Sequence, residues 1–411
     1  MKSNPFLTDT FKETWVKHFN SQKKVYHFPE FNYVNFVESK KGISTIYSNV
    51  GKTHTKGIYY TVNKQNTTPN NNNVLLIYDV PKYYNIDVQN SLKVISSRQY
   101  PGFLIHLSEH KDLNSYLLSK FKKSSRYKLK KYKKRLESCF NISTKSYFGE
   151  IEKNEYDYIF DCFRKLLEKR FEDKQTVNNN LDTKEWNFYF EVAYQLILEK
   201  KACLFVIYNN EKPITITLNY VSDSIIYDAI TVFDIDYSKF HLGSVNIMNL
   251  IEWGITKGYK TLDFSKGYFD YKTRWADLEY DFEYHIYYNP KSLIATCVAK
   301  TLKYKLDLKQ FLREHKVNDK LHEITYKLKN RQEKKEVNYE LILLENNSSK
   351  EYNSLVNINN TQNQILIPAI YDFLYLTLEN INAISVYNTK NEPNKYLIKG
   401  QNKSAEIKIN I

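Results

Sequence analysis

The chain has 411 residues, of which 42% are hydrophobic and 15% aromatic, so it can bury a sizeable core and we expect two or three domains. It has no secretory apolar segment at the N-terminus and no run of about 18 apolar residues, which predicts a cytoplasmic protein without a membrane span. The net charge of +14 is concentrated: residues 120–135 hold ten Lys or Arg and no acid. A protein that binds a long polyanion usually spreads its charge more widely.

The cysteines and histidines are scattered. Cys139, Cys162, Cys203 and Cys297 form no C-x-x-C pair, and the nine histidines do not cluster at metal-ligand spacing. This pattern predicts reduced thiols, no disulfide framework and no metal.

Residues 1–110 predict a β-rich N-terminal lobe. A helix over about 8–19 is expected behind Thr8 or Asp9, both of which suit an N-cap. Short runs rich in β-branched and aromatic residues follow at 25–28, 44–47, 57–62, 74–80 and 103–107.

Residues 111–140 predict a basic connecting helix. Small or apolar side chains recur every three or four residues, at Leu118, Phe121, Ser125, Leu129, Tyr132 and Leu136. One interpretation is a solvated helix that docks through this stripe. The other is a contact surface for phosphate groups or a membrane, in which Arg126 and Lys130 bind the anion.

Residues 141–292 predict an α+β domain. Two helices come first, and the second begins at Asp182 with Glu185 as its capping-box partner. Three strands (202–208, 213–220 and 224–233), a helix from about Ser244, a strand (259–265), a short helix (267–276) and a strand (282–288) follow.

The C-terminal part is less informative. Residues 293–335 predict a charged helical segment and 336–411 a mixed α/β tail. Within the tail, a helix entered through Pro368 and a terminal strand at EIKIN are expected. We assign the tail no role.

The stretch HLGSVNIMNLIEWGITKGYKTLDFSKGYFDYKTRWA, residues 241–276, carries the most specific pattern. It combines a glycine that opens a helix, one that closes it, an Asp-Phe pair followed by glycine, and an aromatic-Lys pair: Gly243, Gly258, Asp263-Phe264, Gly267 and Tyr271-Lys272. In this order the features resemble CelD-like acyltransferases, the branch of the GNAT superfamily linked to bacterial polysaccharide synthesis. They are also similar to the related Fem-type peptidyl transferases.

The resemblance implies a two-lobed α+β fold with a GNAT-like mixed sheet flanked by helices and an added C-terminal region. Residues 1–110 would form a GNAT-like lobe and 141–292 the acyltransferase domain. In that fold the strands at 224–233 and 259–265 splay apart, and the arm of acetyl-CoA or another acyl-CoA enters between them.

The cofactor loop departs from the usual GNAT pattern. FHLGSVN has one glycine where the family commonly has two. Gly243, Ser244 and Val245 are expected to offer N–H groups to the phosphates at a helix N-terminus. We also expect Phe233 and Gly267 to contact the cofactor.

Catalysis is expected to depend on Asp228, Tyr271 and Lys272. Asp228 lies in an otherwise apolar strand, which suggests a general base; alternatively it faces water. Lys272 is expected to neutralise developing charge and Tyr271, or Tyr268, to protonate the leaving group. The alternative packs Tyr271 in the core and leaves Lys272 at the surface. Asp263 is expected to cap a turn, Glu252 to be solvated and Trp275 to be core.

Three functions follow. The first is acyl transfer from acyl-CoA to an amine or hydroxyl of a sugar, lipid-linked or other cell-envelope precursor. The second is a Fem-type transfer that uses aminoacyl-tRNA. The third is a non-catalytic protein that binds nucleic acid or, peripherally, an anionic membrane.

Overall fold

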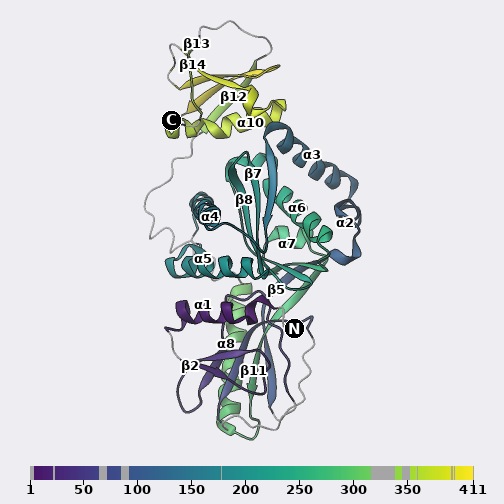
Figure 1. Cartoon of the computed structure of the whole chain (residues 1–411), viewed down its shortest axis with the longest axis vertical. Coiled ribbons are helices and arrows are strands. Elements are labelled where there is room, and N and C mark those ends of the chain that lie inside the picture. Colours follow the sequence, from purple (N-terminus) through teal and green to yellow (C-terminus); the bar gives the residue numbers. More distant parts are fainter. Residues whose placement is uncertain are drawn as a thin grey trace.

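An eleven-stranded mixed sheet runs through most of the chain in the computed structural model, which describes residues 4–21, 24–63, 72–84, 92–176, 178–315, 338–344, 352–358, 360–389, 392 and 394–410 (Figure 1). The strand order is β1-β2-β3-β4-β11-β5-β10-β9-β8-β7-β6. The strands are β1 Val25–His27, β2 Asn35–Lys40, β3 Ile46–Asn49, β4 Val74–Pro81, β5 Lys93–His106, β6 Ile142–Tyr147, β7 Ala202–Asn209, β8 Lys212–Val221, β9 Ile225–Phe233, β10 Thr261–Lys266 and β11 Leu278–Tyr288. Only β3–β4 and β9–β10 are parallel pairs among them.

Helices cover both faces of this sheet. They are α1 Asp9–Phe19, α2 Leu113–Lys120, α3 Lys123–Cys139, α4 Lys153–Asp173, α5 Thr183–Leu198, α6 Leu242–Thr256, α7 Asp270–Trp275 and α8 Leu293–Glu314, with 3-10 turns η1 Pro5–Leu7, η2 Leu107–Glu109, η3 Asn179–Leu181 and η4 Ile235–Phe240. The apolar stripes of α4 and α5 pack with α1 on one side of β7–β9, and α6 packs on the other. The expected GNAT-like α+β architecture is confirmed.

Local sequence signals explain several helix ends. The Thr8 side chain accepts from the amide of Phe11 and caps α1, as expected. Asp182 caps α5 through Lys184, but Glu185 does not complete a capping box. Its carboxylate contacts His54 Nε2 at 2.7 Å instead, because α5 packs against the N-terminal part.

Residues 57–62 do not form the expected strand. Ile58, Tyr59 and Tyr60 are buried, yet the segment forms an isolated bridge between Val62 and Phe31 and a bond from the Ile58 amide to the Asp79 carbonyl at 2.9 Å. The apolar run reflects burial rather than ladder pairing.

The basic segment is two helices rather than one. Phe121 is extended (φ −123°, ψ 143°) and ends α2 before α3 begins. Its ring packs edge-on against Trp275 at 5.0 Å, and this contact favours the break. Leu118 is therefore off the stripe and 53% exposed, whereas Leu129 and Leu136 are fully buried.

Strand β11 joins the two halves of the sheet. It pairs antiparallel with β4 over residues 282–288 and with β5 over residues 278–288. The strand that follows α7 thus completes the N-terminal half.

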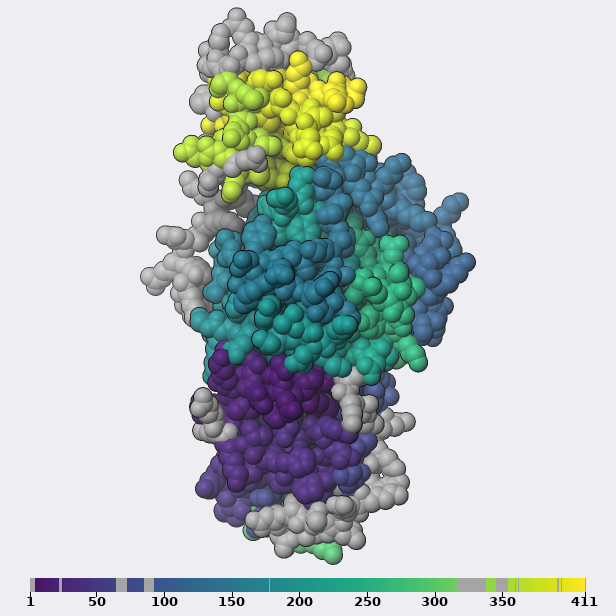
Figure 2. Space-filling view, viewed as in Figure 1, coloured from purple at the N-terminus to yellow at the C-terminus, as the bar shows by residue number. Residues whose placement is uncertain are grey.

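A second sheet closes the chain. Its order is β12 Asn338–Leu344, β16 Ser404–Asn410, β15 Lys395–Lys399, β14 Ser385–Thr389 and β13 Tyr352–Leu355, and it carries η5 Thr361–Leu366, α10 Ile367–Thr377 and η6 Ile381–Ala383. The helix through Pro368 and the terminal strand are as expected. Figures 1 and 2 show this unit stacked on the α3 end of the molecule.

Candidate active site

Strands β9 and β10 form a fork. They pair in parallel from Ile225–Thr261 to Tyr227–Asp263, and beyond that point β9 runs on to Phe233 beside β8 alone. Strand β10 stays paired with β5, with an irregularity between Asp263 and Lys266 where the φ of Ser265 is +58°. Ala229 is an extra residue in the β8–β9 ladder, a bulge that leaves backbone groups out of the regular pairing at the fork.

Asp228 lies at this fork and does not face water. It is 9% exposed, and Thr231 Oγ1 donates to its Oδ1 at 2.8 Å. Burial raises its pKa, while the charges of Lys272 and Lys56 oppose the rise. The acid in the apolar strand is thus held inside the site.

Lys272 is also buried, at 4% exposure. Its Nζ donates to the carbonyls of Ser265 and Lys266 at 3.2 and 2.9 Å, so it fixes the turn after β10. Gly267, with φ +126°, belongs to the same turn. Burial lowers the pKa of Lys272 to about 8. The alternative prediction, that Lys272 lies at the surface, is wrong.

Tyr271 lies at the mouth of the fork rather than in the core. It is 39% exposed, and its ring meets Phe264 edge-on at 5.9 Å. Burial of its hydroxyl, and then the nearby Asp228, raise its pKa. The structure therefore brings Asp228, Tyr271 and Lys272 together.

Asp263 lies beside them and anchors tyrosines. It accepts from the amide of Ser265 at 2.7 Å, as a turn cap, and from Tyr280 and Tyr83 at 2.6 and 3.2 Å. Burial raises its pKa to about 6. Trp275 is 1% exposed, as predicted for a core residue.

Helix α6 begins at the far end of β9. A Cβ on Gly243 would lie 3.0 Å from the Phe233 ring, so packing alone accounts for this glycine. The guanidinium of Arg170 lies 4.5 Å from the centroid of that ring. The sequence alone did not indicate a role for Arg170, which lies in the last turn of the amphipathic helix α4.

Two of the three amides expected to bind phosphate are already engaged. The N–H groups of Ser244 and Val245 donate to the carbonyl of His241 at 2.8 and 3.2 Å. This corrects the prediction, because the first helical turn uses them. The amides that precede the first intrahelical bonds are those of Leu242 and Gly243.

Residues 119–273, which include the fork and α6, match the family model of the acetyltransferase (GNAT) domain. The chain carries a GNAT-type acyltransferase domain. This domain makes the chain an acyltransferase, as expected.

Solved structures are similar at low identity, and no curated protein matches. FemX is 10% identical with a TM-score of 0.44, covering 72% of this chain and 94% of its own. The C-terminal domain of a putative lysylphosphatidylglycerol synthetase from Agrobacterium fabrum is 10% identical (TM-score 0.40; 71% and 91% covered). L-PGS from Bacillus licheniformis is 10% identical (TM-score 0.40; 73% and 98% covered).

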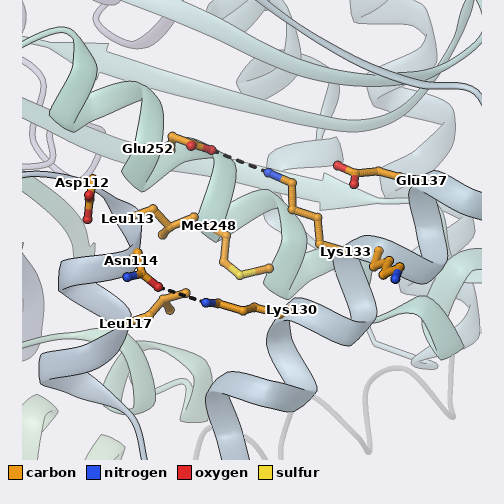
Figure 3. Close-up of a pocket in the computed structure, with 10 residues that line it drawn as sticks. Asp112, Leu113, Asn114, Leu117, Lys130, Lys133, Glu137, Met248 and Glu252 are labelled. Atoms are coloured by element: carbon orange, nitrogen blue, oxygen red, sulfur yellow. Dashed lines mark hydrogen bonds and ion pairs between the residues drawn. The ribbon is translucent and has the colours of Figure 1, made fainter. Parts of the chain in front are cut away.

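Arg126 and Lys130 lie apart from the fork of the acyltransferase domain. Arg126 donates to the carbonyl of Phe121 at 2.5 Å, and Lys130 donates to Asn114 Oδ1 at 3.0 Å. Lys130 lines a pocket of about 400 Å³ between α2, α3 and α6 (Figure 3). Glu252, 3.6 Å from Lys133, lies at the same pocket, on the other side of α6 from the sheet.

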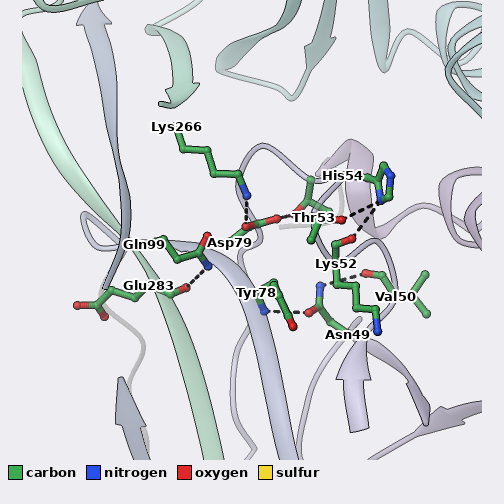
Figure 4. A network of polar contacts seen from close by, with 11 residues as sticks. Asn49, Val50, Lys52, Thr53, His54, Tyr78, Asp79, Gln99, Lys266 and Glu283 are labelled. Carbon is green, nitrogen blue, oxygen red and sulfur yellow. Dashed lines mark hydrogen bonds and ion pairs between the residues drawn. The ribbon is translucent and has the colours of Figure 1, made fainter. Parts of the chain in front are cut away.

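The N-terminal half supplies further charged groups that the sequence did not single out. Lys266 pairs with the buried Asp79, which also accepts from Thr55 at 2.8 Å (Figure 4). Burial, and then Lys266, lower the pKa of Lys56 to about 8. Lys56 and Asp79 had no sequence signal, because only the fold brings them to the fork.

Within the described residues, no group of three His, Cys, Asp or Glu side chains is placed to hold a metal ion. The same part of the chain has no helix that is both long and apolar enough to cross a bilayer.

Proposed function

We propose that the domain transfers an acetyl or other acyl group from acyl-CoA to an amine or hydroxyl of a sugar or other cell-envelope precursor. The observation that carries the proposal is the fork, which places a buried carboxylate beside a buried lysine where β9 and β10 separate. The motif at 241–276 favours the polysaccharide-linked CelD-like branch, and the scattered cysteines favour a cytoplasmic enzyme.

Asp228 would act as the general base. The acceptor amine or hydroxyl loses a proton as its nitrogen or oxygen attacks the thioester carbonyl, and a buried carboxylate with a raised pKa can take that proton. The C–S bond then breaks. Lys272, charged below pH about 8, would stabilise the developing negative charge, and Tyr271 would deliver a proton to the leaving thiolate.

The start of α6 fits the pyrophosphate of an acyl-CoA. The helix dipole favours an anion there, and Leu242 and Gly243 hold the first amides. Arg170 lies over Phe233 beside Gly243, and the charge of Arg274 acts on His241. When bound, acyl-CoA would supply the thioester carbonyl.

Ligand binding tests this proposal directly. Acetyl-CoA or a longer acyl-CoA at 100 times its Kd should stabilise the folded protein by about 2.7 kcal/mol, seen as a raised melting temperature. Acyl-pantetheine thioesters, which lack the nucleotide and pyrophosphate of CoA, are the control and should stabilise the protein less. An unchanged melting temperature with every thioester would contradict the proposal.

A Fem-type transfer from aminoacyl-tRNA is the second candidate. The engaged amides of Ser244 and Val245 and the charges of α3 favour it. It predicts tRNA retention that weakens steeply with salt. The absence of a gel shift at low salt would argue against it.

A non-catalytic binder of nucleic acid or an anionic membrane is the third candidate. Neutralising Lys128, Lys130, Lys131, Lys133 and Lys134 together should then abolish function, while Lys272→Ala leaves it intact. The opposite result supports an enzyme.

A further inference from the structure

A row of polar side chains lies buried between the sheet and α6. It consists of the buried Thr215, Thr217 and Asn219 from β8, Asp228 from β9 and Asn246 from α6, with the half-buried Thr231 of β9 beside them. Layers between a sheet and a helix are normally filled by apolar side chains. This row begins at the proposed base and extends away from the fork.

Hydrogen bonds link part of the row to Asp228. Asn246 Nδ2 donates to Thr217 Oγ1 at 3.0 Å, and Thr217 and Thr231 hydroxyls are 3.1 Å apart. Each hydroxyl has one proton, and a carboxylate only accepts. Thr231 Oγ1 reaches both Thr217 Oγ1 and Asp228 Oδ1 as a donor but has one proton to give. When that proton goes to the carboxylate, the Thr217 hydroxyl is left to donate to Thr231, and the chain of donors then points at Asp228.

Other atoms of the row have no hydrogen-bond partner among the residues that the structure describes. These are Thr215 Oγ1, Asn219 Nδ2 and Oδ1, and Asn246 Oδ1, on residues that are at most 1% exposed. An unpaired buried polar group costs about 1–3 kcal/mol. Buried water commonly satisfies such groups when several lie close together.

Asn219 lies beside Asp228. The two are directly opposed in the β8–β9 register, so their side chains leave the same face of the sheet. Opposed Cβ atoms in antiparallel strands are about 5 Å apart. One water molecule on the Asn219 amide can therefore reach the carboxylate.

We propose that Asn219 and Asn246 flank an internal water site that hydrogen-bonds to Asp228 from beneath α6. Together with the Asn246–Thr217–Thr231 chain, this water orients the carboxylate and stabilises its charged form. Asn219, Thr217 and Asn246 are thus positioning residues for the base. The catalytic consequence rests on the proposed function, whereas the water site does not.

The charged and titratable groups around Asp228 remain in place when this row is altered. Lys272 and Tyr271 come from α7, Lys56 precedes the buried 57–60 segment, and Asp263 lies on β10. Removing the water or the hydroxyl chain should therefore raise the pKa of Asp228 by the loss of hydrogen bonds alone.

The first test needs no activity. A crystal structure at about 1.5 Å should show water within hydrogen-bond distance of Asn219. Carboxyl ¹³C NMR of the wild type and of Asn219→Leu should show the Asp228 titration midpoint raised by about one pH unit in the variant. A dry site, with Asn219→Leu more stable and the midpoint unchanged, would overturn the proposal.

The second test separates this inference from the proposed function. Thr217→Val should move the acid limb of the pH–rate profile upward and lower kcat about tenfold on that limb, with KM unchanged. Thr217→Ser, which keeps the hydroxyl, should restore both. If Asp228→Asn retains full activity while the NMR midpoint still moves in Asn219→Leu, the proposed role of Asp228 fails and the water site stands.

Discussion

Asp228 and Lys272 are buried at the same fork, and burial pushes both toward their neutral forms. Each opposes that effect on the other, because their opposite charges attract. A substrate that displaces water from the fork strengthens this coupling. A reacting group at the fork can therefore change the protonation of Asp228 or of Lys272 readily.

Asp228→Asn should lower kcat/KM at least a hundredfold, because it removes the general base and keeps the shape. Thioester consumption by the purified variant measures this effect. Glu252→Gln is the matched control, since Glu252 is an acid on α6 outside the fork. Equal losses in both variants would contradict the assignment.

The lowered pKa of Lys272 predicts opposite pH dependences for acyl-transfer activity and for folding stability. Acyl transfer should decline above pH about 8, as Lys272 loses its proton. Folding stability should change the other way: between pH about 8 and 10.4 the unfolded chain holds a proton that the folded chain lacks, so this group makes stability rise with pH.

Urea unfolding at pH 8 and pH 10 measures the stability contribution, as the difference between wild type and Lys272→Met. Groups that do not interact with Lys272 titrate equally in both proteins and cancel, whereas Lys56, whose charge acts on Lys272, also titrates near pH 8, so its variant Lys56→Met is measured alongside. The unfolding free energy of the wild type minus that of Lys272→Met should increase from pH 8 to pH 10. A decrease over this range would contradict the lowered pKa.

The motif predicted Tyr271 and Lys272 because both lie in one continuous stretch. Lys56, Asp79 and Arg170 come from three distant segments, and no spacing relates them to the fork. The alternative prediction placed Tyr271 in the core and Lys272 at the surface. The structure has the opposite arrangement, with the lysine buried and the tyrosine at the mouth of the fork. Periodicity indicates which face is covered, but not which long side chain turns inward.

At the scale of elements, the start of α6 combines packing with the ligand binding that we propose. Gly243→Ala would crowd the Phe233 ring at 3.0 Å, and the ring would have to move. Alanine is also the better helix former, by about 1 kcal/mol. The two effects oppose each other, so the melting temperature should change little.

Acyl-CoA affinity should nevertheless fall several-fold in Gly243→Ala, because a displaced Phe233 disturbs Arg170 above it. Isothermal titration calorimetry measures the change. Adding Phe233→Leu should relieve the crowding and recover part of the affinity. Unchanged binding in Gly243→Ala would remove this end of α6 from the cofactor site.

Element types were largely predictable, since α4 and α5 follow a clear period of 3.6 and β7–β9 are short apolar and β-branched runs bounded by turn signals. The break between α2 and α3 was not, because it depends on a contact between Phe121 and the distant Trp275. Strand β6 has exposed polar positions and no alternating signal, and its pairing with β7 supplies the order.

At the scale of the molecule, the C-terminal sheet shares a core with the acyltransferase domain. Phe140 and Tyr237 pack against Tyr371 of α10, Lys239 pairs with Asp372, and Arg135 donates to the carbonyl of Tyr375. This unit therefore covers apolar surface that the domain would otherwise expose.

Truncation after Glu314 should lower the melting temperature by several degrees, because burying one large apolar side chain contributes about 1.5–3 kcal/mol. Acyl transfer per folded molecule should persist, since the fork lies elsewhere. Differential scanning fluorimetry and transfer assays measure the two effects. A truncated chain with wild-type stability would show that the shared core contributes little.

Strand β11 also determines when the sheet can close during synthesis. Strands β4 and β5 leave the ribosome early, but each pairs with β11, which ends at residue 288. Until then both strands present open backbone edges, and open edges invite pairing with other chains. Strands β1 to β4 can pair with one another early, but one edge of β4 and the whole of β5 must wait for β10 and β11, and the yield in cells should therefore depend on chaperones that bind nascent chains.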